Sequence, residues 1–179
     1  MSKHWPFFAI LFFLVGALAL LIITQEQVIT QGDEIILATR PVDPRDLFRG
    51  EYVILRYEIE SSELASKAAE GMDKGEALYV RVEPSASGTA EIVETSVRKP
   101  DFSNGIWIKG EVTGSSFRSS VRFPSIEQFY VPEGAGRPIE RMRTGLNVKA
   151  SVYQGEVRIT ELLDAELNPI NPADYIEQE

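Results

Sequence analysis

The sequence predicts a small, mainly antiparallel β-domain, barrel-like or sandwich-like, with two short helices and one transmembrane helix before it. Three observations predict this class. A 19-residue apolar run lies near the N-terminus, seven later segments are rich in β-branched and aromatic residues, and the links between them have turn composition. The chain of 179 residues has room for one membrane segment and one compact domain.

The apolar run, residues 5–23, has no charged or strongly polar side chain. As a helix it would be roughly 28 Å long, close to the hydrocarbon thickness of a bilayer. Ala17-Leu18-Ala19 resembles a signal-peptide cleavage site, but the apolar residues after it favour a retained signal-anchor. Lys3 precedes the run and the first arginine after it is Arg40, which favours a domain outside the cytoplasm.

The rest of the chain divides by composition. Residues 1–4 form a short leader, residues 24–33 a tether or helix extension, residues 34–164 the β-domain and residues 165–179 a surface tail. We expect seven or eight strands, over residues 34–40, 51–59, 77–84, 90–98, 106–114, 146–154 and 156–164.

Turn and helix signals connect these strands. The segments "PSASGT" and "QGE" predict hairpins, and Gly155 supplies a positive φ in the second, so antiparallel pairing is expected. Residues 61–71 predict a helix with Ser61 or Ser62 as N-cap and Gly71 as terminator. Residues 137–145 predict a second helix.

Composition excludes several function classes. After the apolar run the chain carries 17 of its 18 basic residues and all 27 acidic ones, a formal charge of −10, which argues against a nucleic-acid partner. There is no cysteine, and the single histidine, His4, precedes the apolar run. Thiolate and imidazole chemistry in the domain are therefore excluded, and no metal or cofactor is expected.

One charged corner, "PVDPRDLFRGEYVILRY" at residues 41–57, leads into the second predicted strand. Pro41 and Pro44 fix two φ angles, and Gly50 allows the turn into the strand. Two arginines and two aspartates lie between Pro41 and Gly50, and a glutamate follows. This group can close into a network that holds the loop in one shape, or can face outward to bind a ligand or partner. These residues are Asp43, Arg45, Asp46, Arg49 and Glu51.

Alternation in this strand predicts its buried face. Tyr52 and Arg56 fall on the outer face, whereas Val53, Leu55, Tyr57 and Ile59 fall on a core-like face. The buried Tyr57 hydroxyl then needs a partner, for which Asp43 or Asp46 is a candidate.

A second stretch, "FYVPEGAGRPIERMRTG", also combines prolines, glycines and charged residues after a predicted strand. Phe129 and Val131 are expected to close a strand on the core, Pro132 to stop its pairing, and Gly134 to form a turn. The alternative is an anion site built from this turn and Arg137, which Glu133 would oppose. A third alternative pairs Glu133 or Glu140 with Arg45 or Arg49 across the fold.

The string "GEYVILRY" at residues 50–57 resembles the signature of the bacterial GDYXXLXY family, with Glu51 in place of Asp. Its approach "PVDPRDLFRG" and the stretch "IEQFYVPEGAGRPIE" are similar to other parts of that family. The resemblance implies a membrane-anchored bacterial protein of uncharacterised function, found beside polytopic membrane proteins. It brings no catalytic residue.

Two hypotheses of function follow. The first is a non-enzymatic, single-pass protein of the bacterial inner membrane whose outward-facing β-domain binds a polytopic membrane protein. The second is an envelope ligand-binding or glycan-hydrolysing domain that uses Asp43, Asp46 and Glu51. The candidate binding residues are Asp43, Arg45, Asp46, Arg49, Glu51, Tyr52, Glu133 and Arg137, and the structural motif comprises Pro41, Pro44, Gly50, Leu55, Tyr57, Pro132 and Gly134.

Overall fold

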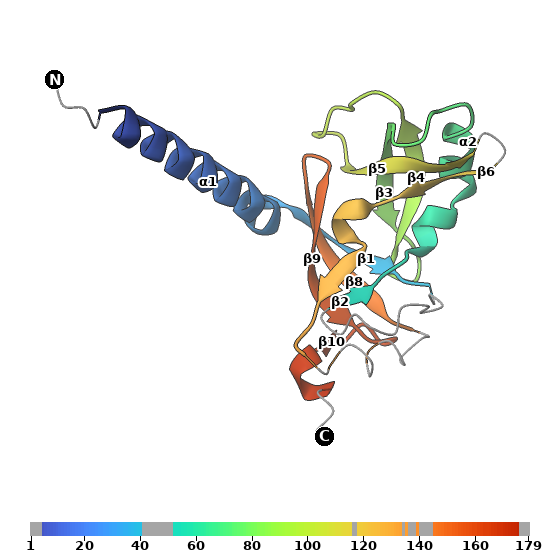
Figure 1. Ribbon diagram of the computed structural model, residues 1–179. Helices are drawn as coiled ribbons and strands as arrows, with labels where there is room; N and C mark the ends of the chain where they lie inside the picture. The colour runs from blue at the N-terminus through green and yellow to red at the C-terminus, as the bar shows by residue number, and fades with distance from the viewer. Residues whose placement is uncertain are drawn as a thin grey trace.

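A long helix, α1 (Trp5–Gln31), projects from a β-domain (Figure 1). The computed structural model describes residues 5–40, 52–115, 118–133, 135, 139 and 145–175. Within those residues α1 is the one helix long and apolar enough to cross a membrane, and large apolar side chains along it, such as Phe7, Phe12 and Ile22, are exposed. For residues 24–33 the sequence left open a tether or an extension of the helix. The structure shows the extension for residues 24–31, which are part of α1.

Ten strands of the described residues form three sheets, all with antiparallel pairing, and the two larger sheets curve into half-barrels (Figure 1). The first sheet has the order β1 (Asp33–Ala38), β8 (Asn147–Tyr153), β9 (Glu156–Leu163) and β10 (Pro169–Ile170). The second has the order β4 (Ala90–Ser96), β3 (Ala77–Pro84), β5 (Ile106–Ser115) and β6 (Arg118–Arg122). The third pairs β2 (Tyr52–Ile54) with β7 (Gln128–Tyr130).

The half-barrels enclose one hydrophobic core and touch at the β8–β9 hairpin. The Lys109 N–H donates to the Gly155 carbonyl oxygen at 2.9 Å, and Gly155 has the positive φ (+88°) predicted for this turn. Apolar side chains from all three sheets and from the segments between them fill the core. The largest fully buried ones are Tyr57, Phe123, Leu37, Leu78, Ile108, Ile126, Ile139 and Leu162.

Short helices complete the domain. The predicted helix over 61–71 is found as a 3₁₀ turn, η1 (Glu58–Ser61), and a helix, α2 (Glu63–Ala68), which begins after Ser62. Gly71 follows with φ +79°, as a terminator requires. Two further 3₁₀ turns are η2 (Pro124–Ile126) and η3 (Pro172–Tyr175). The second predicted helix, 137–145, lies outside the described residues except for the buried Ile139 and for Gly145.

The strand predicted over 51–59 is wrong in length. Its ladder, β2, ends at Ile54, and the chain turns into η1 at Glu58. The alternation nevertheless holds to Tyr57, because that residue keeps extended backbone (φ −112°, ψ 145°) and forms an isolated bridge with Thr39. Strands β6 and β10 were not predicted. β10 pairs with β9 and buries Ile170, so part of the predicted surface tail belongs to the core.

Candidate functional site

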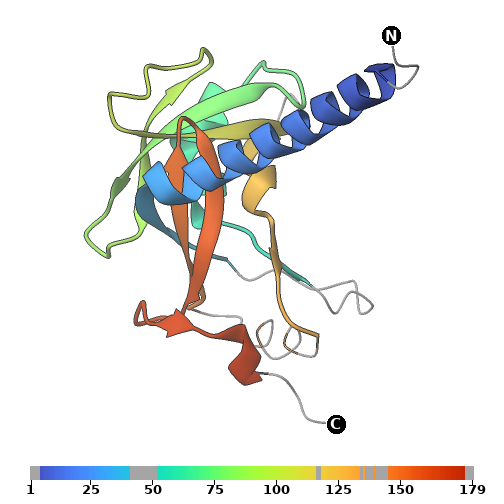
Figure 2. The ribbon, with the colours of Figure 1, turned by 90° about the vertical axis from the view of Figure 1, so that its left-hand side faces the viewer.

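The junction between α1 and the domain has no free linker. Val28 on the last turns of α1 is buried, and its carbonyl oxygen accepts a 2.6 Å hydrogen bond from Ser151 Oγ on β8. Arg158 Nε on β9 donates to Gln25 Oε1 at 2.7 Å. Figure 2 shows the last turns of α1 against the β8–β9 hairpin. These contacts hold the helix and the domain in one arrangement.

Gly32 makes this close approach possible. It is the single residue between α1 and β1, and a Cβ there would overlap Ser151 Oγ and the Val28 carbonyl oxygen. No larger residue fits without moving the helix from the sheet.

The strand predicted over residues 51–59, which we call the signature strand, places its predicted inner face in the core. Val53, Leu55, Tyr57 and Ile59 are all buried, which confirms the alternation. The Tyr57 hydroxyl donates at 2.6 Å to the carbonyl oxygen of Ile126, a partner that the sequence did not predict. The predicted partners, Asp43 and Asp46, lie outside the described residues. Burial raises the pKa of this phenol, and the nearby carboxylates of Glu60 and Glu127 raise it further. Tyr57 therefore acts as a neutral donor.

Glu60 and Glu127, the two glutamates that act on this hydroxyl, are paired with three arginines. We call the five residues the charge cluster: Arg40, Arg56, Glu60, Arg122 and Glu127. The Glu127 carboxylate receives Arg56 Nη1 at 2.9 Å and Arg122 Nη2 at 2.8 Å. Arg122 Nε lies 2.6 Å from the same carboxylate, an ion-pair contact without the direction of a hydrogen bond. Glu127 is thus clamped between two guanidinium groups.

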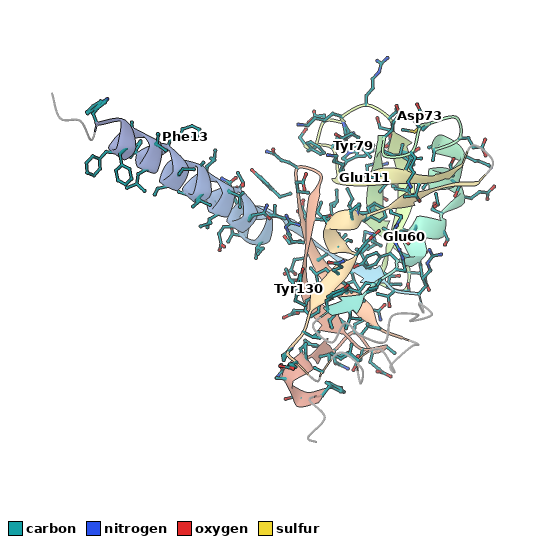
Figure 3. The ribbon with its side chains drawn as sticks, in the orientation of Figure 1. Phe13, Glu60, Asp73, Tyr79, Glu111 and Tyr130 are labelled. Atoms are coloured by element: carbon teal, nitrogen blue, oxygen red, sulfur yellow. The ribbon has the colours of Figure 1, made fainter. Side chains whose placement is uncertain are left out.

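Glu60 is the most buried member of the cluster, with only 2% of its side chain exposed. Figure 3 labels it within the β-domain. Its Oε2 accepts from Arg40 Nη2 at 3.1 Å. Its buried Oε1 has no hydrogen-bond partner, and Arg56 Nη1 lies 3.9 Å away. Burial raises the pKa of this carboxyl although Arg56 and Arg40 oppose the shift.

The contacts within the charge cluster indicate a structural role. Each arginine is engaged by a carboxylate, and each carboxylate by at least one arginine. Such mutual pairing fixes the positions of these side chains, which favours a structural role over a catalytic one. Sequence reasoning missed it, because its members come from segments up to 87 positions apart, between Arg40 and Glu127. The signal available was Arg56, the one charged side chain within residues 52–57.

Most of the predicted binding residues lie outside the part of the chain that the structure describes. Of the candidates, only Tyr52 and Glu133 are placed: Tyr52 is in β2, and Glu133 is exposed in the turn after β7. Phe129 packs against the core, Val131 is buried and β7 ends before Pro132, as predicted. The residues singled out from the sequence that lie outside the described part of the chain are Pro41, Asp43, Pro44, Arg45, Asp46, Arg49, Gly50, Glu51, Gly134, Arg137 and Glu140.

A separate cleft of about 300 Å³ opens between β1 and the β3–β4 hairpin. Its wall is mainly apolar, and the charged groups at its rim are already paired: Lys149 Nζ lies 2.9 Å from Glu34, and Arg81 Nη1 lies 2.6 Å from Glu83. Among the described residues no group of three or more acidic, histidine or cysteine side chains is arranged to hold a metal ion.

A family model described as GDYXXLXY protein matches residues 14–162, which is most of the chain and includes the second half of the apolar run. No curated protein and no solved structure matches the chain.

Proposed function

Because the chain belongs to the GDYXXLXY family, we propose that it is a single-pass, membrane-anchored accessory protein whose extracytoplasmic β-domain binds a membrane-protein partner. The observation that carries the proposal is the linker-free junction between α1 and the domain. The buried Ser151–Val28 hydrogen bond and the Arg158–Gln25 contact fix the domain relative to the helix.

A fixed junction has a physical consequence for binding. A domain on a flexible tether samples many orientations and loses that freedom when it docks on a neighbour in the membrane. A domain already held by its anchor loses less, so its affinity for a partner in the same bilayer is higher. This arrangement suits recognition of another membrane protein better than capture of a diffusing substrate.

The proposed location is the bacterial inner membrane, with the domain facing the periplasm or the outside. Lys3 lies before the apolar helix, and the next basic residue is Arg40. The family match begins at Leu14, inside the apolar helix, which supports a retained anchor as part of the family's shared unit.

The domain's chemistry supports a binding role. The described acidic residues at its centre, Glu60 and Glu127, are paired with arginines that hold strands together. The charged corner at 41–51, in this proposal, serves the same framework. A glycan-hydrolysing role would instead require Asp43, Asp46 and Glu51 to act on a ligand.

The experiment that tests the proposal is in vivo crosslinking of the full-length protein, followed by purification in mild detergent and mass spectrometry. We expect one polytopic membrane protein to be recovered in stable proportion. Recovery of the protein alone under several gentle conditions would contradict the proposal. So would loss of a hydrolytic activity in Asp43→Asn and Asp46→Asn variants that keep the wild-type melting temperature, because that result supports the ligand site.

A further inference from the structure

The outer face of the β2–β7 ribbon carries exposed aromatic and aliphatic side chains. Register places Tyr52 opposite Tyr130 and Ile54 opposite Gln128, and we call these four residues the tyrosine face. Tyr130 is 72% exposed and Ile54 is 39% exposed. The rings of Tyr52 and Tyr130 meet edge to face, with centroids 6.1 Å apart.

The ribbon beneath this face is held firmly. Its inner side chains, Val53 and Phe129, pack into or against the core. The Leu55 N–H donates to the Glu127 carbonyl oxygen at 2.8 Å, directly beside the strand pair. The Glu127 side chain is in turn bound by Arg56, so the charge cluster fixes both strands at this end. A two-stranded ribbon is marginal by itself, and these contacts pre-form the tyrosine face.

The position of this face relates it to the membrane. Tyr130 stands at the edge of the domain on the side from which α1 leaves (Figure 3). The junction at Val28 holds α1 against the domain, so this side keeps its orientation relative to α1. A binding partner that reaches Tyr130 therefore lies beside α1.

The charge of the domain favours a protein, and not the lipid surface, as the partner that binds the tyrosine face. The chain after the apolar run carries a formal charge of −10, which an anionic bilayer surface repels. Near the ribbon, Arg56 and Arg122 are both bound to Glu127, and Glu133 is exposed just after β7. A cationic side chain fits this setting, because it can stack on a tyrosine ring and approach a carboxylate.

We propose that the tyrosine face binds an extracytoplasmic loop of the membrane-protein partner, and that an arginine or lysine of this loop packs on Tyr130 near Glu133. The inference rests on the proposed function and names the surface that performs it. Exposed tyrosines backed by a rigid framework are typical of the few residues that dominate the affinity of an interface.

Site-specific photo-crosslinking in cells tests this surface. A photoreactive phenylalanine analogue replaces Tyr130 in the full-length protein, and the matched control carries it at Leu64, a 49% exposed residue of α2 on the far side of the domain (Figure 1). We expect position 130 to crosslink to the same polytopic protein that co-purifies with the wild type, and position 64 not to.

Substitutions supply the second measurement. Tyr130→Ala is expected to lower the affinity for the co-purified protein by roughly 10-fold or more. Glu133→Lys is expected to lower it in a salt-dependent way, whereas Leu64→Ala leaves it unchanged. Because Tyr130 is exposed, its truncation keeps the wild-type melting temperature.

The outcomes separate this inference from the function on which it rests. Crosslinks from position 64 but not 130, or an unchanged affinity for Tyr130→Ala, would overturn the tyrosine face and leave the proposed function standing. Crosslinks from position 130 to phospholipid alone would also overturn it. Absence of any protein crosslink or co-purified protein would overturn both.

Discussion

Tyr57 donates a 2.6 Å hydrogen bond to the carbonyl oxygen of Ile126, which lies 69 positions later in the chain. Both residues are fully buried, so the bond joins the signature strand to η2 inside the core. The second tyrosine of "GEYVILRY" thus has a structural role, and Leu55 beside it is buried as well. Tyr52 differs, because it lies on the outer face of the β2–β7 ribbon with Tyr130.

Replacing Tyr57 by Phe tests this bond. The substitution leaves the Ile126 carbonyl oxygen buried without its donor, and we expect unfolding to become easier by about 1–3 kcal/mol. Tyr130→Phe is the matched control, because its ring is exposed and its stability should not change. The measurement is denaturant unfolding of the full-length protein in detergent. Equal stabilities for the two variants would show that the bond contributes little.

The pKa of Glu60 predicts a pH dependence of stability. Burial raises the pKa of the folded carboxyl above its ordinary value of 4.5, so the folded state binds this proton more readily than the unfolded state. The resulting stability is fully present below pH 4.5 and is lost as the pH rises through the folded pKa. We expect the stability of the wild type relative to Glu60→Gln to fall across that window.

Melting temperatures measured at closely spaced pH values check this, with Glu58→Gln, whose side chain is exposed, as the control. If the stability of the wild type relative to Glu60→Gln instead rises with pH, the effect of Arg40 and Arg56 on the pKa of Glu60 outweighs the effect of burial.

The ion pair between Arg56 and Glu127 is expected to stabilise the ribbon. Arg56→Met removes one of the two guanidinium groups from a carboxylate that is only 19% exposed, and we expect a loss of about 1–3 kcal/mol. Lys67→Met removes a pair on α2 in which both side chains are mostly exposed, and no measurable change is expected. Chemical denaturation compares the two. A similar small effect for both variants would contradict the structural role of the charge cluster.

Gly32→Ala is expected to loosen the junction between α1 and the domain. The added Cβ would overlap Ser151 Oγ and the Val28 carbonyl oxygen, so the helix must move or lose its hydrogen bond. Gly16→Ala is the control, because its Cβ meets nothing within 4 Å. Spin labels on α1 and β9 report the change as a broader distance distribution in Gly32→Ala only. An unchanged distribution would show that the junction accommodates the methyl group.

Local properties of the sequence determined the apolar helix, the positions of the main strands and the inner face of the signature strand. These follow from short-range rules: an unbroken apolar run of this length is typical of a helix that can cross a membrane, alternation places Val53 and Leu55 on one side, and Gly155 permits a tight hairpin. The tertiary structure decided the rest. Ile126 as the partner of Tyr57, Glu127 as the partner of Arg56, and the contact of Val28 with Ser151 all join segments distant in the chain. No local pattern encodes these pairings, because each depends on how the sheets pack and on which polar groups must be satisfied once water is excluded.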